Sequence, residues 1–244
     1  MANLKFLVFD IETGPNLGYI WGKYEQNVLA YEKEWELLSF AYKWVGTSKT
    51  IAVGQNKFTE EQLVLRLWHL FDEADVVIAH NGNKFDIRKI NAKFLEYGLT
   101  PPSPYKSIDT LLVARRYFAL NSNKLDDLGT LLRVGNKIKH SGFELWLRCL
   151  RGEAKAWAEM LRYNKQDVVL LEKVYLRLLP WITNHPNRGD LYQTNGVCPK
   201  CGSAKLTRRG FTKARIPKQR YQCECGGWCN ESSVKKPGRL VNAT

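Results

Sequence analysis

The stretch that most constrains this chain is VFDIET at residues 8–13, which closes the apolar run KFLVFDIET. Apolar residues on both faces predict a central strand that is buried on both sides. Asp10 and Glu12 stand two positions apart, so both side chains project from the same face of such a strand. Two neighbouring carboxylates repel each other and are costly in an apolar interior. The pair therefore predicts a site for Mg²⁺ or Mn²⁺, unless one acid faces solvent at the strand end.

The segments after this strand alternate between strand and helix patterns. LLSFAYKWV and TIAVGQ predict strands joined by a turn at residues 46–48, and TEEQLVLRLWHLFDEA predicts a helix capped by Thr59 with Gln62. DVVIAHN predicts another buried strand, FDIRKINAKFLEYG a helix that stops at Gly98, and KSIDTLLVARRYF a short strand entering a helix. The longest predicted helix, AKAWAEMLRYNKQDVVLLEKVYLRLL, ends before Pro180. This order predicts an α/β domain with a mixed sheet flanked by helices.

Two later segments carry acids that could join the first pair. HNGNKFD places Asp86 at the boundary between a predicted strand and a predicted helix. The positive end of the helix dipole favours the ionised form of the Asp86 carboxylate. YNKQD places Tyr163 and Asp167 four positions apart on the longest predicted helix, so both can address one spot. Taken singly, Asp86 is equally well explained as a helix-start acid. Tyr163 and Asp167 alone would suit a solvent-exposed helix face.

Together, FDIET, NGNKFD and YNKQD resemble in order and in type the three motifs of the DEDD superfamily of 3′-to-5′ exonucleases. Members of that superfamily share a ribonuclease-H-like fold. The last motif contains a tyrosine, and in this respect the chain resembles the tyrosine branch of the superfamily. That branch includes the proofreading domains of family B and family A DNA polymerases. The resemblance spans about residues 4–180. No polymerase domain follows it, and in this arrangement the chain resembles free-standing, phage-encoded members of the superfamily.

The resemblance implies a two-metal mechanism in which Asp10, Glu12, Asp86 and Asp167 hold two Mg²⁺ or Mn²⁺ ions about 4 Å apart. We assign Asp10 to bridge both ions, and Glu12 with Asp167 to the ion that carries the nucleophilic water. Asp86 would hold the second ion mostly through intervening water. Tyr163 would orient the nucleophilic water by a hydrogen bond, because a tyrosine with its ordinary pKa near ~10 is a poor base at neutral pH.

A cysteine-rich segment near the end of the chain predicts a small zinc ribbon. CPKC at 198–201 has the spacing of a zinc knuckle, and CECGGWC at 223–229 offers three thiols for the two remaining places. Because Cys225-Gly226-Gly227-Trp228 resembles the usual end of such ribbons, we expect Cys198, Cys201, Cys223 and Cys225 to bind Zn²⁺, with Cys229 as the substitute for Cys225. Disulfide pairing is the alternative, and a reducing compartment disfavours it.

The charge of the chain is concentrated in this segment, which predicts two domains, 1–186 and 187–244. Of a net charge of +13, residues 187–244 contribute 12 Lys and Arg against 3 Asp and Glu. A segment this compact and basic predicts a polyanionic partner, although a basic face used only for protein contacts is the alternative. The candidate nucleic-acid-binding residues lie between the two cysteine pairs and are Arg208, Arg209, Lys213, Arg215, Lys218 and Arg220.

An aromatic segment separates the first strand from the second. Residues 14–35 contain Tyr19, Trp21, Tyr24, Tyr31 and Trp35, interleaved with lysines. Packing in the core is the more frequent fate of such side chains, and stacking on unpaired bases is the alternative.

The chain carries no apolar run long enough for a transmembrane helix and no secretory signal. We therefore expect it in the cytoplasm, which is the host cytoplasm if the chain is phage-encoded. Our leading hypothesis is a metal-dependent 3′-to-5′ exonuclease on single-stranded nucleic acid, with DNA favoured over RNA by the polymerase-like tyrosine motif. The alternatives are a structure-selective endonuclease or ribonuclease on the same fold, or a non-catalytic nucleic-acid-binding protein. Clustered acids argue against the last, because they would repel a phosphate.

Overall fold

A mixed sheet forms the centre of the structure, a computed structural model that describes residues 4–24, 27–191, 194–232 and 240–242. The five strands of this sheet are arranged in the order β5-β4-β1-β6-β7, so that β1 (Phe6–Thr13) lies in the middle, as its apolar character predicts. On one side, β4 (Leu37–Trp44) and then β5 (Ile51–Gly54) run antiparallel to their neighbours. On the other side, β6 (Val76–Ala79) and β7 (Lys106–Asp109) are parallel. The predicted α/β class is confirmed.

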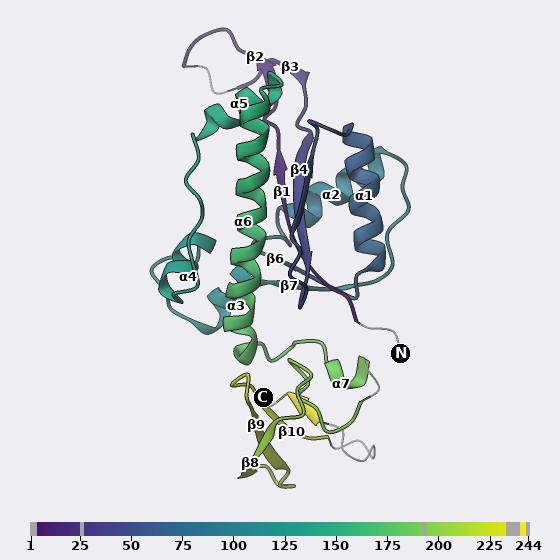
Figure 1. Cartoon of the computed structure of the whole chain (residues 1–244), viewed down its shortest axis with the longest axis vertical. Coiled ribbons are helices and arrows are strands. Elements are labelled where there is room, and N and C mark those ends of the chain that lie inside the picture. Colours follow the sequence, from purple (N-terminus) through teal and green to yellow (C-terminus); the bar gives the residue numbers. More distant parts are fainter. Residues whose placement is uncertain (1–3, 25–26, 192–193, 233–239, 243–244) are drawn as a thin grey trace.

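Helices cover both faces of the sheet (Figure 1). One face carries α1 (Glu60–Glu73) and α2 (Asp86–Glu96), and the other carries α6 (Ala154–Leu178) with α3 (Thr110–Tyr117), α4 (Leu125–Leu131) and α5 (Phe143–Leu150). Thr59 caps α1 with the predicted capping box, and α6 passes into a 3-10 turn at Leu179–Trp181, named η1, which contains Pro180. Within the described ranges, no helix is long and apolar enough to cross a membrane.

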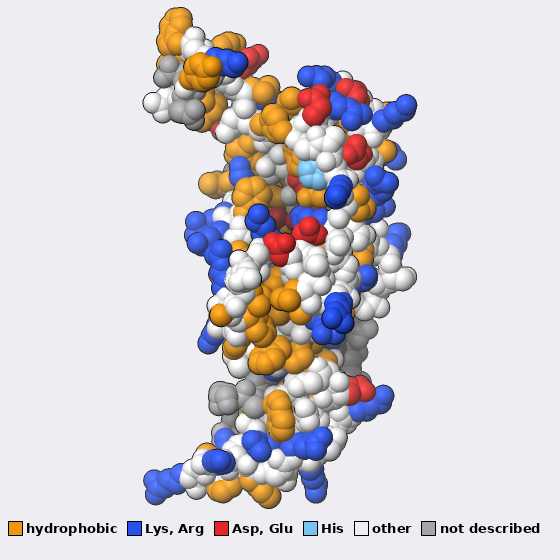
Figure 2. Space-filling model, turned by 90° about the vertical axis from the view of Figure 1, so that its left-hand side faces the viewer, with side chains coloured by type: hydrophobic (Ala, Val, Ile, Leu, Met, Phe, Trp, Pro, Cys, Tyr) orange, Lys and Arg blue, Asp and Glu red, His pale blue; other side chains and the backbone are white. Residues whose placement is uncertain are grey.

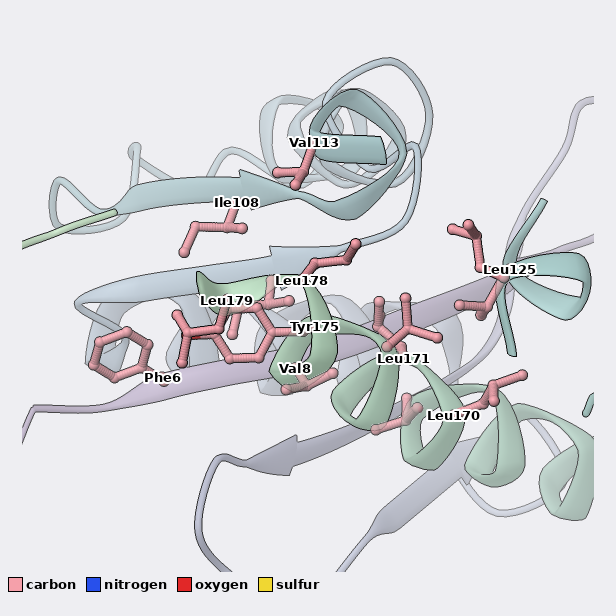
Figure 3. Packing of buried hydrophobic residues seen from close by; sticks show 14 of the residues in the cluster. Phe6, Val8, Ile108, Val113, Leu125, Leu170, Leu171, Tyr175, Leu178 and Leu179 are labelled. Carbon is pink, nitrogen blue, oxygen red and sulfur yellow. The ribbon is translucent and has the colours of Figure 1, made fainter. Parts of the chain in front are cut away.

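The alternation of β1 sends its side chains to two separate cores. Leu7, Phe9 and Ile11 pack with α1 and α2. Phe6 and Val8 point to the opposite face, where they join Leu171, Tyr175 and other apolar residues of α6 (Figure 3). Asp10 and Glu12 continue the even-numbered series, so they face α6 rather than α1.

The aromatic segment forms a projecting hairpin of β2 (Leu17–Tyr19) and β3 (Ala30–Lys33), at the top of Figure 1. Tyr19, Trp21, Tyr24 and Tyr31 are 57%, 86%, 85% and 55% exposed. Core packing, the fate that the sequence favours, is therefore wrong for these four residues, because the hairpin pairs with itself and not with the main sheet. Trp35 alone is half-buried, with the ammonium groups of two lysines of α2 over its ring.

The C-terminal segment folds into a second small sheet beyond the end of α6. Its strands are arranged in the order β11-β10-β9-β8. Their bounds are β8 (Leu206–Phe211), β9 (Gln219–Cys223), β10 (Trp228–Glu231) and β11 (Leu240–Asn242). We call this sheet with its cysteine loops, residues 194–232 and 240–242, the ribbon. A short helix, α7 (Arg188–Leu191), lies in the connection to it.

Candidate active site

Three acidic side chains from two distant segments meet on the face of β1 that α6 covers. Carboxylate oxygens of Asp10, Glu12 and Asp167 all lie within 4.8 Å of one another. The first two come from the even-numbered face of β1, and Asp167 comes from the middle of α6, where it is 1% exposed. Tyr163 lies one helical turn before Asp167 and faces the same region. The structure thus brings together four of the five residues that the motifs single out.

Asp86, the fifth residue, reaches this region from the first position of α2, directly after the turn that follows β6. Asn81 has a left-handed backbone with φ of 64°, and its N–H donates to Asp109 Oδ1 at 2.9 Å. A Cβ on Gly82 would lie 2.3 Å from a neighbouring side chain, so only glycine fits this close turn. The buried Asp86 carboxylate accepts a hydrogen bond from the Ile11 N–H at 3.3 Å, between the two acids of β1. Asp86 therefore lies beside the group of three and not within it.

Asn164, the neighbour of Tyr163, orients Asp10. Its side-chain amide is fully buried and donates to Asp10 Oδ2 at 2.7 Å. Its oxygen accepts a hydrogen bond from Ser39 Oγ at 3.3 Å, and Ser39 lies on β4 next to β1. These contacts hold the Asp10 carboxylate in one orientation independently of any cation.

Lys137 supplies positive charge beside the acids. Its ammonium donates to Asp167 Oδ2 at 2.5 Å and to the Tyr163 hydroxyl at 3.0 Å. The other oxygen of Asp167, Oδ1, is buried and has no hydrogen-bond partner within the described part of the chain. A bare carboxylate oxygen next to two further carboxylates suits a hard divalent cation. The donor set therefore fits a metal centre.

Burial and mutual repulsion oppose simultaneous ionisation of the acids. Desolvation, with the charges of Asp86, Glu12 and Asp167, raises the pKa of Asp10 well above its ordinary value. Desolvation and then the charge of Asp167 raise the pKa of Glu12 to about 8, and burial raises that of Asp86 to about 6. A nearby cation favours the ionised forms. The carboxyl groups of this site are therefore stable either when they are protonated or when they bind metal ions.

A second candidate metal centre lies in the ribbon. The Sγ atoms of Cys198, Cys201, Cys223 and Cys225 lie within 4.8 Å of one another. All six cysteines of the chain are in the described ranges and none forms a disulfide, so the disulfide alternative is wrong. Cys229 is buried in β10 and lies outside the group. The structure thus assembles the four expected thiols and leaves out the substitute. Cys225 also accepts a hydrogen bond from the Gly227 N–H at 3.4 Å.

The six basic candidates of the ribbon all lie at or near its surface. Arg208 and Arg209 lie on β8, Lys213, Arg215 and Lys218 lie in the β8–β9 connection, and Arg220 lies on β9. Lysine and arginine side chains gather over the ribbon at the lower edge of Figure 2.

Comparison with known proteins assigns the chain to a family. The RNase_H_2 model, described as RNase_H superfamily, matches residues 7–179. The chain belongs to the RNase_H superfamily. The matched residues include all five motif residues and Lys137.

Two polymerases are similar to this RNase H superfamily chain. A stretch of 147 residues is 30% identical to the DNA polymerase III PolC-type of Ureaplasma parvum, over 54% of this chain and 10% of that protein. The fold is similar to that of the family B DNA polymerase from the hyperthermophilic archaeon Pyrobaculum calidifontis, with a TM-score of 0.57 at 16% identity. That match covers 74% of this chain and 25% of the polymerase. The chain thus spans only a small part of each relative.

The sequence did not predict the residues that neutralise and orient the acids of this site. Asn164 stands inside the YNKQD motif, and its place one residue after Tyr163 is the only sequence signal for it. Lys137 lies in the irregular segment between α4 and α5, 30 residues before Asp167, and no periodicity or local motif indicates its role. Its contact with Asp167 exists only through the tertiary fold.

We expect the affinity of the acid cluster for Mn²⁺ to increase from about pH 6 to about pH 8, by up to about tenfold per pH unit for each proton displaced. Glu12 has its ordinary pKa of 4.5 in the unfolded chain and a pKa of about 8 in the metal-free folded chain. At pH values between these two, the folded chain keeps a proton on Glu12 that the unfolded chain has released. This proton stabilises the metal-free fold at low pH, and the stabilisation is lost as the pH rises through about 8. Calorimetry of Mn²⁺ binding in two buffers of different ionisation enthalpy measures the number of protons released on binding. The Glu12→Gln variant should release fewer protons than the wild type. Metal binding without proton release at about pH 6 would contradict this expectation.

We expect Lys137→Met to destabilise the metal-free protein by about 1–3 kcal/mol, because Asp167 is left buried without its cation. The cost stays below that of a fully buried pair because the Lys137 side chain is 32% exposed. Since the ammonium and a metal ion compete for the same carboxylate, Mn²⁺ should raise the melting temperature of this variant more than that of the wild type. Lys43→Met, which breaks the Lys43–Glu172 pair away from the site, is the matched control and should leave the Mn²⁺-induced shift unchanged. Equal shifts for all three proteins would contradict the competition.

Proposed function

We propose that the chain is a metal-dependent 3′-to-5′ exonuclease that hydrolyses phosphodiester bonds of single-stranded nucleic acid, with DNA preferred over RNA. The observation that carries the proposal is the convergence of Asp10, Glu12 and Asp167, with a bare, buried oxygen on Asp167. The order of the three motifs supports the exonuclease assignment, and the tyrosine motif supports DNA. Similarity to two DNA polymerases is consistent with this substrate.

The proposed mechanism uses each residue in a role that its surroundings favour. Two Mg²⁺ or Mn²⁺ ions held by the acids would activate a water molecule and offset the charge of the phosphate. Asn164 keeps Asp10 oriented, which suits the bridging role we assign to that carboxylate. Burial raises the pKa of Tyr163, so its hydroxyl stays protonated at neutral pH and can only orient a water molecule by hydrogen bonding.

A cleft that shares Lys137 with the acid cluster offers room for the substrate end. Its volume is about 660 Å³, and its lining includes His80, Asn81, Arg115, Asn123 and Lys137. Asn123 Oδ1 is buried and has no partner in the described part of the chain, so an amide acceptor is left for a ligand donor. Basic and amide groups together suit the phosphates and base edges of a nucleotide. This cleft supports a nucleic-acid substrate at the proposed reaction centre.

The ribbon would add affinity without taking part in hydrolysis. Four thiolates in a compact group suit a structural Zn²⁺, and the exposed basic residues of β8, with the half-buried Arg220 of β9, would contact phosphates of the bound strand. The proposed cofactors are thus two Mg²⁺ or Mn²⁺ ions and one structural Zn²⁺.

The test is a cleavage assay with single-stranded DNA and RNA labelled at either the 3′ or the 5′ end. The purified protein is incubated with Mg²⁺ or Mn²⁺, with and without EDTA. Stepwise shortening from the 3′ end that EDTA abolishes is the expected result. Internal cuts would instead indicate an endonuclease, and faster loss of RNA would indicate a ribonuclease. Binding without metal-dependent cleavage would contradict any nuclease function.

A further inference from the structure

A cleft with aromatic walls lies where the ribbon meets the end of α6. Its volume is about 490 Å³. One wall comes from the nuclease layers, with Tyr117 at the end of α3 and Trp181 in η1. The other wall comes from the ribbon, with Lys213, Arg220 and Trp228. Lys213 and Arg220 are two of the six basic candidates of the ribbon, but no role is assigned above to the cleft or to its aromatic side chains.

The two indole rings of the cleft remain accessible although they are large and apolar. Trp181 is 54% exposed and meets the ring of Phe118 edge-on, with ring centroids 5.1 Å apart. Trp228 is 37% exposed, and the guanidinium of Arg220 lies 5.3 Å from its ring centroid. Figure 2 shows hydrophobic side chains gathered between mid-height and the basic lower edge of the molecule. Accessible indole faces beside a cation are suited to stacking of an unpaired base.

The charge of the cleft favours an anionic ligand. Lys200, Lys213 and Arg220 contribute to its lining, and none of its described lining residues is acidic. The Nε atom of Arg220 is buried and has no hydrogen-bond partner among the described residues. A phosphate oxygen would satisfy this donor.

One contact between the two walls, and two contacts of the connecting segment with β1, hold the cleft in a preformed shape. The ammonium of Lys200 donates to the carbonyl oxygen of Pro180, so the zinc knuckle is joined to η1. His185 stacks on Phe6 of β1 with ring centroids 5.8 Å apart, and the guanidinium of Arg188 lies 4.0 Å from the same Phe6 ring. A preformed site loses less entropy on binding than one that must close.

We propose that this junction cleft binds an unpaired nucleotide of the substrate strand, with its base stacked on Trp228 and its phosphate at Arg220. This inference rests on the proposed function, because it takes the strand to be the substrate of the nuclease site. Asp167 and the end of α6 at Leu178 are 11 residues apart, or about 16 Å along the helix. The cleft therefore holds a nucleotide upstream of the reacting end and contributes affinity and not chemistry.

The test measures binding of a fluorescent single-stranded DNA of about 16 nucleotides without added Mg²⁺ or Mn²⁺ and without a chelator, so that cleavage plays no part and the ribbon keeps its Zn²⁺. Trp228→Leu should weaken binding about 5- to 100-fold, whereas Trp228→Phe, which retains a ring, should bind within a few-fold of the wild type. Arg220→Ala should flatten the dependence of log affinity on log salt by about 0.7, the value for one lost phosphate contact of a single strand. Lys205→Ala, which removes an exposed ribbon charge outside the cleft lining, is the matched control and should change the affinity less.

Zinc content and thermal unfolding of each variant show whether the ribbon stays folded. Wild-type affinity of Trp228→Leu, or equal losses in Trp228→Leu and Trp228→Phe with zinc retained, would overturn the proposal. These outcomes leave the nuclease function untouched, because cleavage of short oligonucleotides reports on the acids alone. Conversely, stacking-dependent binding without cleavage would refute the exonuclease and leave the cleft as a nucleic-acid site.

Discussion

Asp10→Asn is expected to lower metal-dependent hydrolysis by at least about 10³-fold and, at about pH 8, to raise the melting temperature of the metal-free protein. Activity is lost because a neutral amide binds a divalent cation far more weakly than the carboxylate does. Stability rises because the folded protein no longer has to hold this charge buried beside Asp86, Glu12 and Asp167, whose repulsion adds to desolvation in raising the Asp10 pKa. The gain should shrink as the pH falls, since the unfolded chain then also keeps a proton on Asp10 and folding no longer has to supply it. Cleavage assays, and thermal unfolding without added Mg²⁺ or Mn²⁺, measure the two effects.

Glu172→Gln is the matched control for this prediction. Glu172 is also a buried acid, and it accepts a hydrogen bond from the ammonium of Lys43 on β4. Neutralising it removes an attraction and no repulsion, so the melting temperature should fall and the specific activity at low temperature should be unchanged. A fall in the melting temperature of metal-free Asp10→Asn would contradict the reading of this site as a cluster of mutually repelling acids.

Cys198→Ser is expected to abolish binding of the proposed Zn²⁺, to unfold the ribbon and to weaken binding of single-stranded DNA by at least about tenfold. Metal binding contributes about 10 kcal/mol or more to the folding of small zinc modules, which is more than a sheet with so little buried apolar surface can replace. The slope of log affinity against log salt should flatten by about 0.7 for each phosphate contact that is lost. Zinc analysis and binding titrations at several salt concentrations measure these effects. Cleavage of very short oligonucleotides should persist, because the acids lie on β1 and α6.

Two further serine variants identify the fourth thiol ligand. Cys225→Ser should also lose zinc, because its Sγ lies within the group of four. Cys229→Ser should retain zinc and affinity, because Cys229 is buried in β10 outside that group. The opposite pattern would assign Cys229 as the ligand. Full zinc retention in both Cys198→Ser and Cys225→Ser would rule out this site.

The sequence anticipates much of the fold because its local signals agree with one another. The capping box of Thr59 begins α1, and the long apolar face of α6 ends where Pro180 stops it. The hairpin β2–β3 is the exception, since its aromatic composition favours burial and the structure exposes it. Composition reports how apolar a segment is, but the sheet partners of the segment decide whether it is covered.

The sequence by itself determined which side chains share a face: Asp10 with Glu12 through the two-residue period of a strand, and Tyr163 with Asp167 through the helical repeat. Only the tertiary structure decided that these two faces meet, because the even-numbered side of β1 packs on α6. It also placed Lys137 against Asp167 and Asn164 against Asp10. Neighbouring residues alone determine the local periodicity of a strand or helix, whereas contacts across 30 or more positions depend on how the sheet and the helices pack together.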